Sequence, residues 1–275
     1  MIPVLQPAST SMRRTLPGGL PLRVVLGCLL VAWIAAPMVP VLLWSIAGQW
    51  RAPAVLPSSY SLQGFADLAT ADTARAAVSS LSLGLGVAVI ATPLGYVGVL
   101  AVRALPSLPG RFVEFVLLVP LAIPPFALVM GVNVALLRLY VSPTLGVILV
   151  LVVTALPYTA FMFRSALASY DHQFEEVARS LGASPGQAAR HVRYPLLASA
   201  AARAFFLAFL VGWGDYITTL LIGGGQLRTL PLLLGSAAST TGNEQLTAAL
   251  SVAIIIPPLI LLAGLTLPTA RKRRQ

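Results

Sequence analysis

The sequence predicts an all-α integral membrane protein with six transmembrane helices and one patterned polar loop between spans 4 and 5. Of its 275 residues, 57% are hydrophobic and only 9% are charged, far from the usage of soluble domains. Charge-poor apolar windows recur along the chain, each long enough to cross about 30 Å of hydrocarbon as a helix.

The expected spans follow one another at short intervals. They cover residues 24–46, 76–102, 115–137, 139–163, 204–222 and 246–268. The fifth is interrupted by Asp215. Prolines inside the spans predict kinks, at Pro37, Pro93, Pro124, Pro125, Pro157, Pro257 and Pro258.

Basic residues predict the orientation of these spans. With six crossings, fourteen of the eighteen Lys and Arg residues fall on one side of the membrane and four on the other. The four are Arg51, Arg75, Arg138 and Arg228. The positive-inside rule places the richer side, with both termini and the polar loop, in the cytoplasm. The net charge of +10 is therefore explained by topology, and no basic stripe with interleaved aromatics indicates nucleic-acid binding.

The first half of the polar segment predicts an amphipathic helix from about Asp171 to Leu181. Its apolar residues recur with helical spacing on one face, at Phe174, Val177, Ala178 and Leu181. Asp171 can cap the start, and Glu175 and Glu176 suit the positive end of the helix dipole. Gly182 is the expected stop in a left-handed conformation.

A second short helix is expected directly afterwards. Ser184 can cap it, Pro185 suits its first position, and Gln187 completes a capping box. Pro195 is expected to end this helix before the fifth span begins. A simple amphipathic loop lying on lipid is the competing interpretation, but such a helix favours a richer basic face.

The loop resembles that of a known family. The pattern Glu-x-Ala-x3-Gly-x9-Val-x-Tyr-Pro, formed by Glu176, Ala178, Gly182, Val192 and Pro195, is similar to the EAA loop of permease subunits of binding-protein-dependent ABC importers. Val177 and Tyr194 stand where the family usually has alanine and leucine. Both departures keep an apolar side chain. The resemblance extends from about Leu62 to the C-terminus.

This resemblance implies the partners and the role of the loop. Two permease subunits, identical or homologous, line the path, an extracytoplasmic binding protein delivers solute, and each EAA loop enters a groove on one subunit of a cytoplasmic ATPase dimer. The helix from Asp171 to Leu181 would be the coupling helix. The expected ATPase-docking residues are Phe174, Glu175, Glu176, Val177, Ala178, Leu181, Gly182 and Pro195. ATP would be bound by the partner, and this chain would need no cofactor.

A second stretch of sequence, in the fifth expected span, resembles one subgroup of these permeases. Trp213-Gly214-Asp215-Tyr216, with Gly223-Gly224-Gly225 after it, looks like the group that includes spermidine/putrescine, iron(III) and thiamine importers. A cationic organic solute is therefore favoured. A carboxylate at this depth is costly if it faces lipid, so Asp215 is expected to face the interior of the helix bundle. There it is either a hydrogen-bond acceptor at a helix break or, with Trp213 and Tyr216, part of the translocation path.

Other functions are less well supported by the residues. No G-x-x-x-x-G-K-[ST] phosphate loop, catalytic triad or carboxylate pair is present, so an enzyme is not expected. Cys28 lies in an apolar run, and His172 and His191 lack metal-ligand spacing. An ion-driven secondary transporter would need more intramembrane ionisable residues than Asp215. A membrane scaffold would explain the loop but not Asp215.

The expected organisation follows from these points. Residues 1–23 form a cytoplasmic N-terminal segment, residues 24–270 form the permease domain with its coupling loop at 164–203, and residues 271–275 form a basic cytoplasmic tail. The apolar run after Arg13 and Arg14 is too long for a cleaved export signal. The expected location is the bacterial cytoplasmic membrane.

Overall fold

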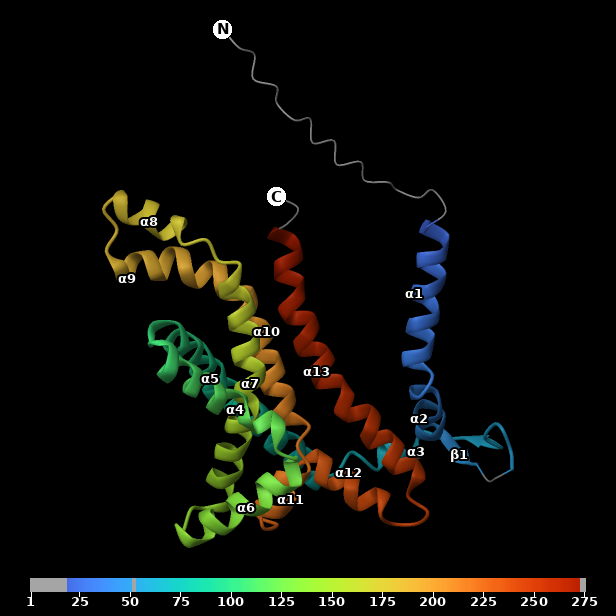
Figure 1. Ribbon diagram of the computed structural model, residues 1–275. Coiled ribbons are helices and arrows are strands. Elements are labelled where there is room, and N and C mark those ends of the chain that lie inside the picture. Colours follow the sequence, from blue (N-terminus) through green and yellow to red (C-terminus); the bar gives the residue numbers. More distant parts are fainter. Residues whose placement is uncertain (1–18, 51–52, 273–275) are drawn as a thin grey trace.

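The computed structural model describes residues 19–50 and 53–272 and is almost entirely helical (Figure 1). Most of the expected N-terminal segment 1–23, and residues 273–275 of the expected tail, therefore lie outside the described residues. In these described residues, four helices are long and apolar enough to cross a membrane, or up to six if each of two bent helix pairs counts as one span. This agrees with an all-α membrane protein.

The first bent pair comprises α1 (Gly19–Ala35) and α2 (Met38–Ser45), which meet at 48°. Pro37 lies at the bend, where a kink is expected from the sequence. A small hairpin of β1 (Ala47–Gln49) and β2 (Ser59–Tyr60) and the short α3 (Gln63–Ala66) follow.

The second bent pair shows that the prediction of a single helix for the third span is wrong. Residues 115–137 are not one helix, because α5 (Ser107–Ala122) and α6 (Pro125–Arg138) meet at 110°. Pro124 forces Ile123 into an extended conformation, with φ −96° and ψ 128°, and neither Pro124 nor Pro125 has an N–H to continue the helix. The sequence predicts the position of this break but not its size.

Three long helices form the core. They are α4 (Ala71–Ala104), α7 (Pro143–Ala168) and α10 (Tyr194–Trp213), which pack on one another. Small residues allow the close approach, since a Cβ on Gly212 of α10 would lie 2.9 Å from the Cα of Gly84 on α4. Such small-residue contacts are typical of helices that pack within membranes. Pro93 and Pro157 lie within α4 and α7 without ending them.

The fourth and fifth expected spans have shifted boundaries. Helix α7 begins at Pro143 rather than near Leu139, after a turn in which Tyr140 has a positive φ of 54°. The fifth is broken, as the interruption at Asp215 suggests: α10 ends at Trp213, and α11 (Ile217–Ile222) follows.

The last part of the chain closes the bundle. The glycines 223–225 lie in a turn, with Gly224 and Gly225 at positive φ. Then α12 (Leu230–Ala238) leads to the long α13 (Glu244–Lys272), which runs through Pro257 and Pro258. The Ser80 hydroxyl of α4 accepts a hydrogen bond of 2.8 Å from the backbone N–H of Leu230 and so fixes the start of α12.

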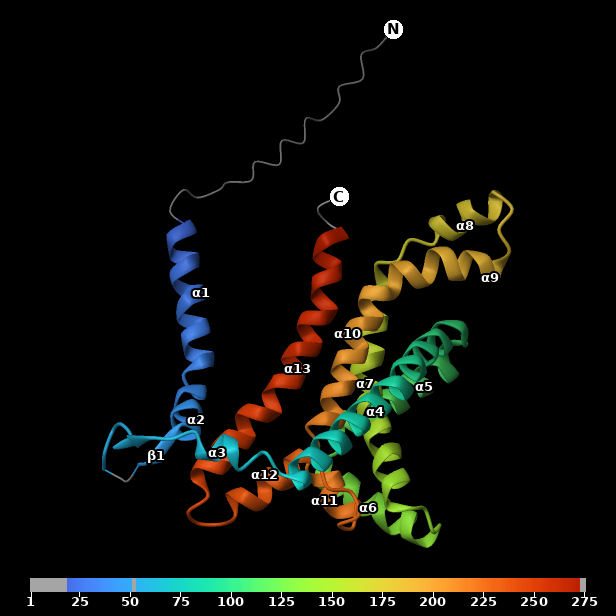
Figure 2. The same ribbon diagram turned by 180° about the vertical axis from the view of Figure 1, so that it is seen from behind.

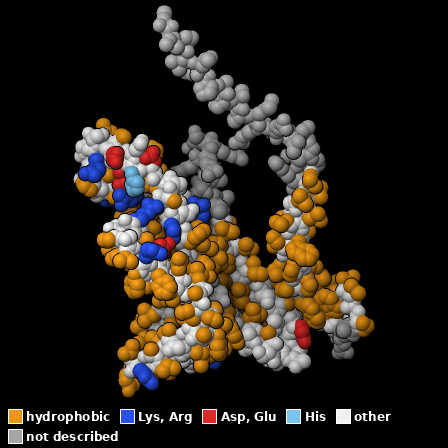
Figure 3. Space-filling view, in the orientation of Figure 1, with side chains coloured by type: hydrophobic (Ala, Val, Ile, Leu, Met, Phe, Trp, Pro, Cys, Tyr) orange, Lys and Arg blue, Asp and Glu red, His pale blue; other side chains and the backbone are white. Residues whose placement is uncertain are grey.

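Both views show how the ends of these elements are arranged (Figures 1 and 2). The beginning of α1, the end of α13 and the hairpin of α8 (Gln173–Ser180) and α9 (Pro185–Ala188) lie at one end of the molecule. The small hairpin, α6, α11 and α12 lie at the other end. Blue Lys and Arg side chains gather over the α8–α9 end in Figure 3.

Candidate functional site

The polar connector after α7 forms the predicted first helix. Helix α8 covers Gln173–Ser180, slightly shorter than the predicted 171–181. The Asp171 carboxylate accepts a hydrogen bond of 2.9 Å from the N–H of Gln173, but the N-cap residue is His172, one position later than predicted. The two glutamates, Glu175 and Glu176, lie in its first turn.

Gly182 ends this helix as predicted. Its φ is +95°, a left-handed conformation that glycine adopts at little cost. The N–H of Gly182 donates to the carbonyl of Arg179, and the N–H of Ala183 donates to that of Ala178. These two bonds form a Schellman motif, which satisfies the last carbonyls of α8 and turns the chain back.

The second helix also begins as predicted. The Ser184 hydroxyl accepts from the N–H of Gln187, and the Gln187 side chain accepts from the N–H of Ser184, which completes a capping box. Pro185 occupies the first turn. Both motifs depend on residues at most five positions apart, which is why local sequence was sufficient to predict them.

The predicted stop at Pro195 is wrong. From Pro185 the chain continues helically through α9, the π-helical turn η1 (Ala189–Arg193) and α10 to Trp213. A π turn widens the helix by one residue, which makes room for the Pro195 ring and accommodates its missing N–H. The second loop helix and the fifth span are therefore one element, so the loop is joined to the core without a flexible link.

A cluster that sequence reasoning missed fastens α8 to this element. The Arg193 guanidinium donates from Nε to Oε1 of Glu175 at 2.8 Å and from Nη2 to Oε2 at 2.6 Å. The Tyr170 hydroxyl donates to the same Oε1 at 2.6 Å. We call Tyr170, Glu175 and Arg193 the clasp. Its Glu175 side chain is only 12% exposed, so this predicted docking residue is already engaged within the chain.

The clasp shifts the titration of its members. Burial, together with the hydrogen bond and negative charge of Glu175, raises the pKa of Tyr170 to about 12. The pKa of Glu175 is lowered, chiefly because the carboxylate accepts hydrogen bonds from Arg193. At neutral pH the clasp therefore contains a neutral phenol, a carboxylate and a guanidinium.

The predicted apolar face of α8 lies free in the chain described here. The exposed fractions of Phe174 and Val177 are 57% each, and that of Leu181 is 83%; Ala178 is partly exposed. Glu176 is exposed, and its side chain makes no hydrogen bond or ion pair within residues 19–50 and 53–272. Thus an apolar stripe beside a free carboxylate is held away from the core by the clasp and the Schellman turn.

Asp215 lies at the break between α10 and α11. Its Oδ2 accepts from the N–H and the hydroxyl of Thr219, both at 2.8 Å, and its Oδ1 accepts from the N–H of Thr218 at 3.2 Å. Both oxygens thus serve the first turn of α11. The acceptor role considered from the sequence is present, with partners on the following helix rather than on a neighbouring span.

The other two path candidates point to different elements. Trp213 is buried, stacks on Phe209 and donates from Nε1 to the carbonyl of Ile254 on α13 at 3.0 Å. Tyr216 is 40% exposed, and its ring lies against Gly235 of α12. The three side chains do not converge on one point in this chain.

The histidines have local partners. Nδ1 of His191 lies 2.9 Å from the carbonyl of Gln187, and the His172 ring meets Tyr170 edge to face. Across the described ranges, no three His, Cys, Asp or Glu residues are placed to hold a metal ion.

Comparison with known proteins matches this amino-acid sequence to a family. Residues 91–269 match the family described as binding-protein-dependent transport system inner membrane component. The chain is 29% identical over 245 residues to a protein of Salmonella typhimurium described as a candidate 2-aminoethylphosphonate transport system permease, covering 88% of this chain and 91% of that protein.

More distant relatives transport other solutes. A spermidine/putrescine transport system permease of Haemophilus influenzae is 26% identical, covering 66% of this chain and 71% of its own length. A trehalose transport system permease of Mycobacterium tuberculosis is 26% identical, covering 74% and 75%. All three are described as permeases of transport systems rather than as enzymes. The chain therefore belongs to the binding-protein-dependent transport system inner membrane components, the ABC importer permeases.

Proposed function

We propose that this chain forms half of the solute path of an ATP-driven importer and docks on a separate ATPase through α8. The observation that carries the proposal is the apolar face of Phe174, Val177 and Leu181, more than half of which the described residues leave exposed. A groove on an ATPase subunit would bury this face, and a basic group there would pair with Glu176. Gly182 sets the angle of the helix, and Pro195 lies in α10, in the helical element that follows.

The clasp supplies the mechanical connection for this function. If the ATPase subunits close on ATP, the docked α8 moves with them. The ion pair of Glu175 with Arg193 passes that motion to η1 and α10 without a flexible joint. Because α10 packs against α4 and α7, the displacement reaches all three core helices.

We propose six spans within residues 24–270, each bent helix pair counting as one, with both termini and the 164–203 connector in the cytoplasm. The fourteen-to-four distribution of basic residues supports this orientation. The grouping of the α8–α9 hairpin with the start of α1 and the end of α13 is compatible with it (Figures 1 and 2). The tail 271–275 would anchor the last span.

Cysteine labelling tests the orientation in intact cells. In a Cys28→Ser background, Tyr60→Cys and Ser236→Cys should react with an impermeant thiol reagent, and Ser184→Cys should react only after lysis. All three positions are exposed, so access and not burial decides the result. Labelling of position 184 from outside would contradict both the orientation and the docking role of α8.

The partners we propose are an ATPase dimer, a second permease subunit and an extracytoplasmic solute-binding protein. Co-purification in mild detergent tests the first of these directly. An ATPase encoded beside this chain should copurify with the unaltered protein and be lost from Val177→Asp, which places a charge on the apolar face. Retention of the ATPase by that variant would contradict docking through this face.

For the solute, we propose a small organic molecule that carries a primary ammonium group. 2-Aminoethylphosphonate and the polyamines, named for two of the relatives, share this group. The charge of Asp215 does not by itself indicate a cationic solute, because both of its carboxylate oxygens accept hydrogen bonds from α11. Cells with the complete transport system should take up labelled 2-aminoethylphosphonate or spermidine but not trehalose. Uptake of trehalose alone would contradict the proposal.

A further inference from the structure

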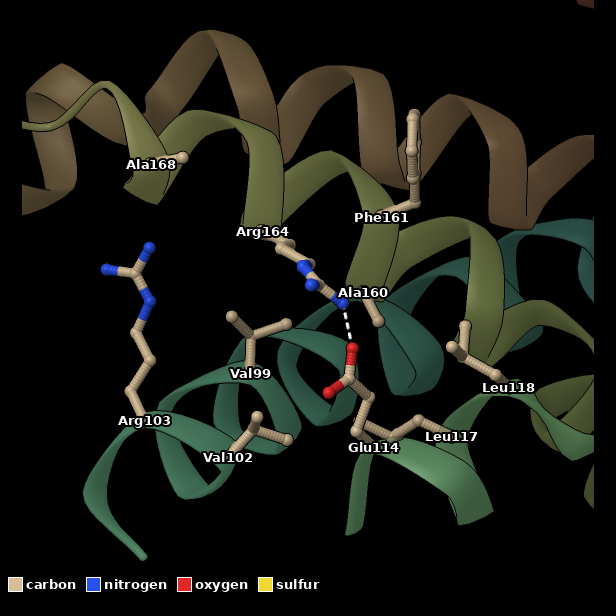
Figure 4. Close-up of a pocket in the computed structure, with 10 residues that line it drawn as sticks. All are labelled: Val99, Val102, Arg103, Glu114, Leu117, Leu118, Ala160, Phe161, Arg164 and Ala168. Carbon is tan, nitrogen blue, oxygen red and sulfur yellow. Dashed lines mark hydrogen bonds and ion pairs between the residues drawn. The ribbon is translucent and has the colours of Figure 1, made fainter. Parts of the chain in front are cut away.

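A groove lies between the ends of α4 and α7 and the middle of α5 (Figure 4), and none of the residues that line it belongs to α8 or α9. Its cavity volume is about 420 Å³. The side chains that line it come from all three helices: Val99, Val102, Arg103, Glu114, Leu117, Leu118, Ala160, Phe161, Arg164 and Ala168.

The groove is apolar along most of its length and open to the surroundings. Phe161 is 64% exposed and Leu118 is 40% exposed, so hydrocarbon can reach both. A second hollow continues along α5 past Phe115 and Val119 and shares Glu114 and Leu118 with the first. Together the two hollows form an extended apolar groove on the outer surface of this chain.

The polar side chains of the groove carry net positive charge. Arg164 of α7 pairs with Glu114 of α5, as the dashed line in Figure 4 marks. Arg103 is exposed and points away from that pair, and its guanidinium has no hydrogen bond or ion pair within the described part of the chain. Arg111 lines the second hollow. The lining of the two hollows thus contains three guanidinium groups and one carboxylate.

We propose that this groove binds one anionic phospholipid. The lipid phosphate would lie between Arg103 and the free N–H groups of Arg164, which keeps donors to spare after pairing with Glu114. An acyl chain would cover Leu117, Leu118 and Phe161. Basic pockets between transmembrane helices on the cytoplasmic side suit acidic lipid headgroups.

The position of the two arginines supports a lipid over a water-soluble anion. Arg103 lies in the last turn of α4, and Arg164 lies one turn before the end of α7, where these helices leave the apolar zone. Guanidinium groups at that level meet lipid phosphates, while the apolar wall meets acyl chains. A soluble anion would gain nothing from the apolar wall.

A bound lipid would join the ends of α4, α5 and α7. Only a few residues separate Ala168, at the end of α7, from α8. Anionic lipid would therefore steady the base from which α8 projects. The binding site itself does not depend on the proposed docking of α8, so lipid binding and ATPase association can fail separately.

Native mass spectrometry of the full chain released from mild detergent tests the site. The protein is mixed with phosphatidylglycerol or phosphatidylcholine of identical acyl chains. We expect one phosphatidylglycerol to be retained in preference to phosphatidylcholine. Arg103→Gln should weaken that retention about fivefold, the effect of one basic residue near an anionic surface. Arg138→Gln, on an exposed arginine at the other end of the molecule, is the matched control.

A second variant tests the apolar wall without changing charge. Leu118→Trp should fill the groove and reduce phosphatidylglycerol retention while Arg103 remains. Equal retention of both lipids, or equal losses in Arg103→Gln and Arg138→Gln, would overturn the proposal. So would efficient disulfide formation between two copies of Leu118→Cys in a Cys28→Ser background in membranes, because the groove would then be covered by protein.

Discussion

The carboxylate of Glu175 receives two hydrogen bonds from the guanidinium of Arg193, at 2.8 and 2.6 Å, across 18 positions of the sequence. This pair joins the projecting helix α8 to the element that becomes α10. The side chains are 12% and 30% exposed, so the pair is largely sheltered from water. This pair is the link through which, in the proposed function, motion of α8 would reach the core.

Removing the arginine should loosen α8. In Arg193→Gln, the partly buried Glu175 carboxylate loses both charged hydrogen bonds, which costs about 1.5–3 kcal/mol of local stability. Hydrogen exchange of the α8 amides should speed up, and the ATPase should associate more weakly. Arg190→Gln is the control, because Arg190 is exposed on the same turn. Unchanged exchange in Arg193→Gln would show that other contacts hold α8.

The tyrosine of the clasp, Tyr170, should lose its proton at a higher pH than an ordinary tyrosine. Its pKa is raised from 10 to about 12 in the folded protein. The proton on Tyr170 therefore stabilises the fold fully below about pH 10, and this contribution is lost as the pH rises towards 12. The ultraviolet difference between the unaltered protein and Tyr170→Phe should show a phenolate forming near pH 12. Glu175→Gln should move that transition to lower pH; an unmoved transition would exclude coupling to Glu175.

Gly182→Val should disturb the angle of α8 while leaving the spans inserted. The space around Gly182 is open, so the cost comes from its φ of +95°, about 1–2 kcal/mol for a residue with a Cβ. ATPase association in a pull-down should fall. Gly186→Val is the matched control, because that glycine also has open space but an ordinary φ. Equal association of the two variants would mean that the left-handed turn is unimportant for docking.

Asp215→Asn should be tolerated better than Asp215→Ala. Asparagine keeps one oxygen for the N-terminal turn of α11, whereas alanine leaves the N–H groups of Thr218 and Thr219 without their acceptor. Loss of such a cap costs about 0.5–2 kcal/mol. Thermal unfolding in detergent should rank unaltered protein, Asn and Ala in that order. If both variants unfold like the unaltered protein but neither supports solute uptake, the charge serves the path instead.

The predictions that the structure confirms rest on short-range rules. Gly182 and the Ser184–Gln187 capping box involve neighbours along the chain, and helix-capping rules predicted both. The clasp joins residues 18 positions apart, and nothing in a single sequence says that Arg193 faces Glu175. Pro195 does not end the helix, because the π-helical turn just before it accommodates the proline. The size of the bend after Ala122, 110°, depends on how α5 packs against α4 and α7 and how α6 packs against α11 and α7. The positions of the prolines alone do not determine it.

In the proposed complex, α8 is the contact with the ATPase. A photoreactive amino acid at Val177, on the exposed apolar face, tests it most directly in cells that express the complete system. We predict a cross-link to the ATPase subunit from position 177 and none from Tyr140, which is 95% exposed at the other end of the molecule. Absence of the cross-link from position 177, in a complex that still copurifies, would contradict the account.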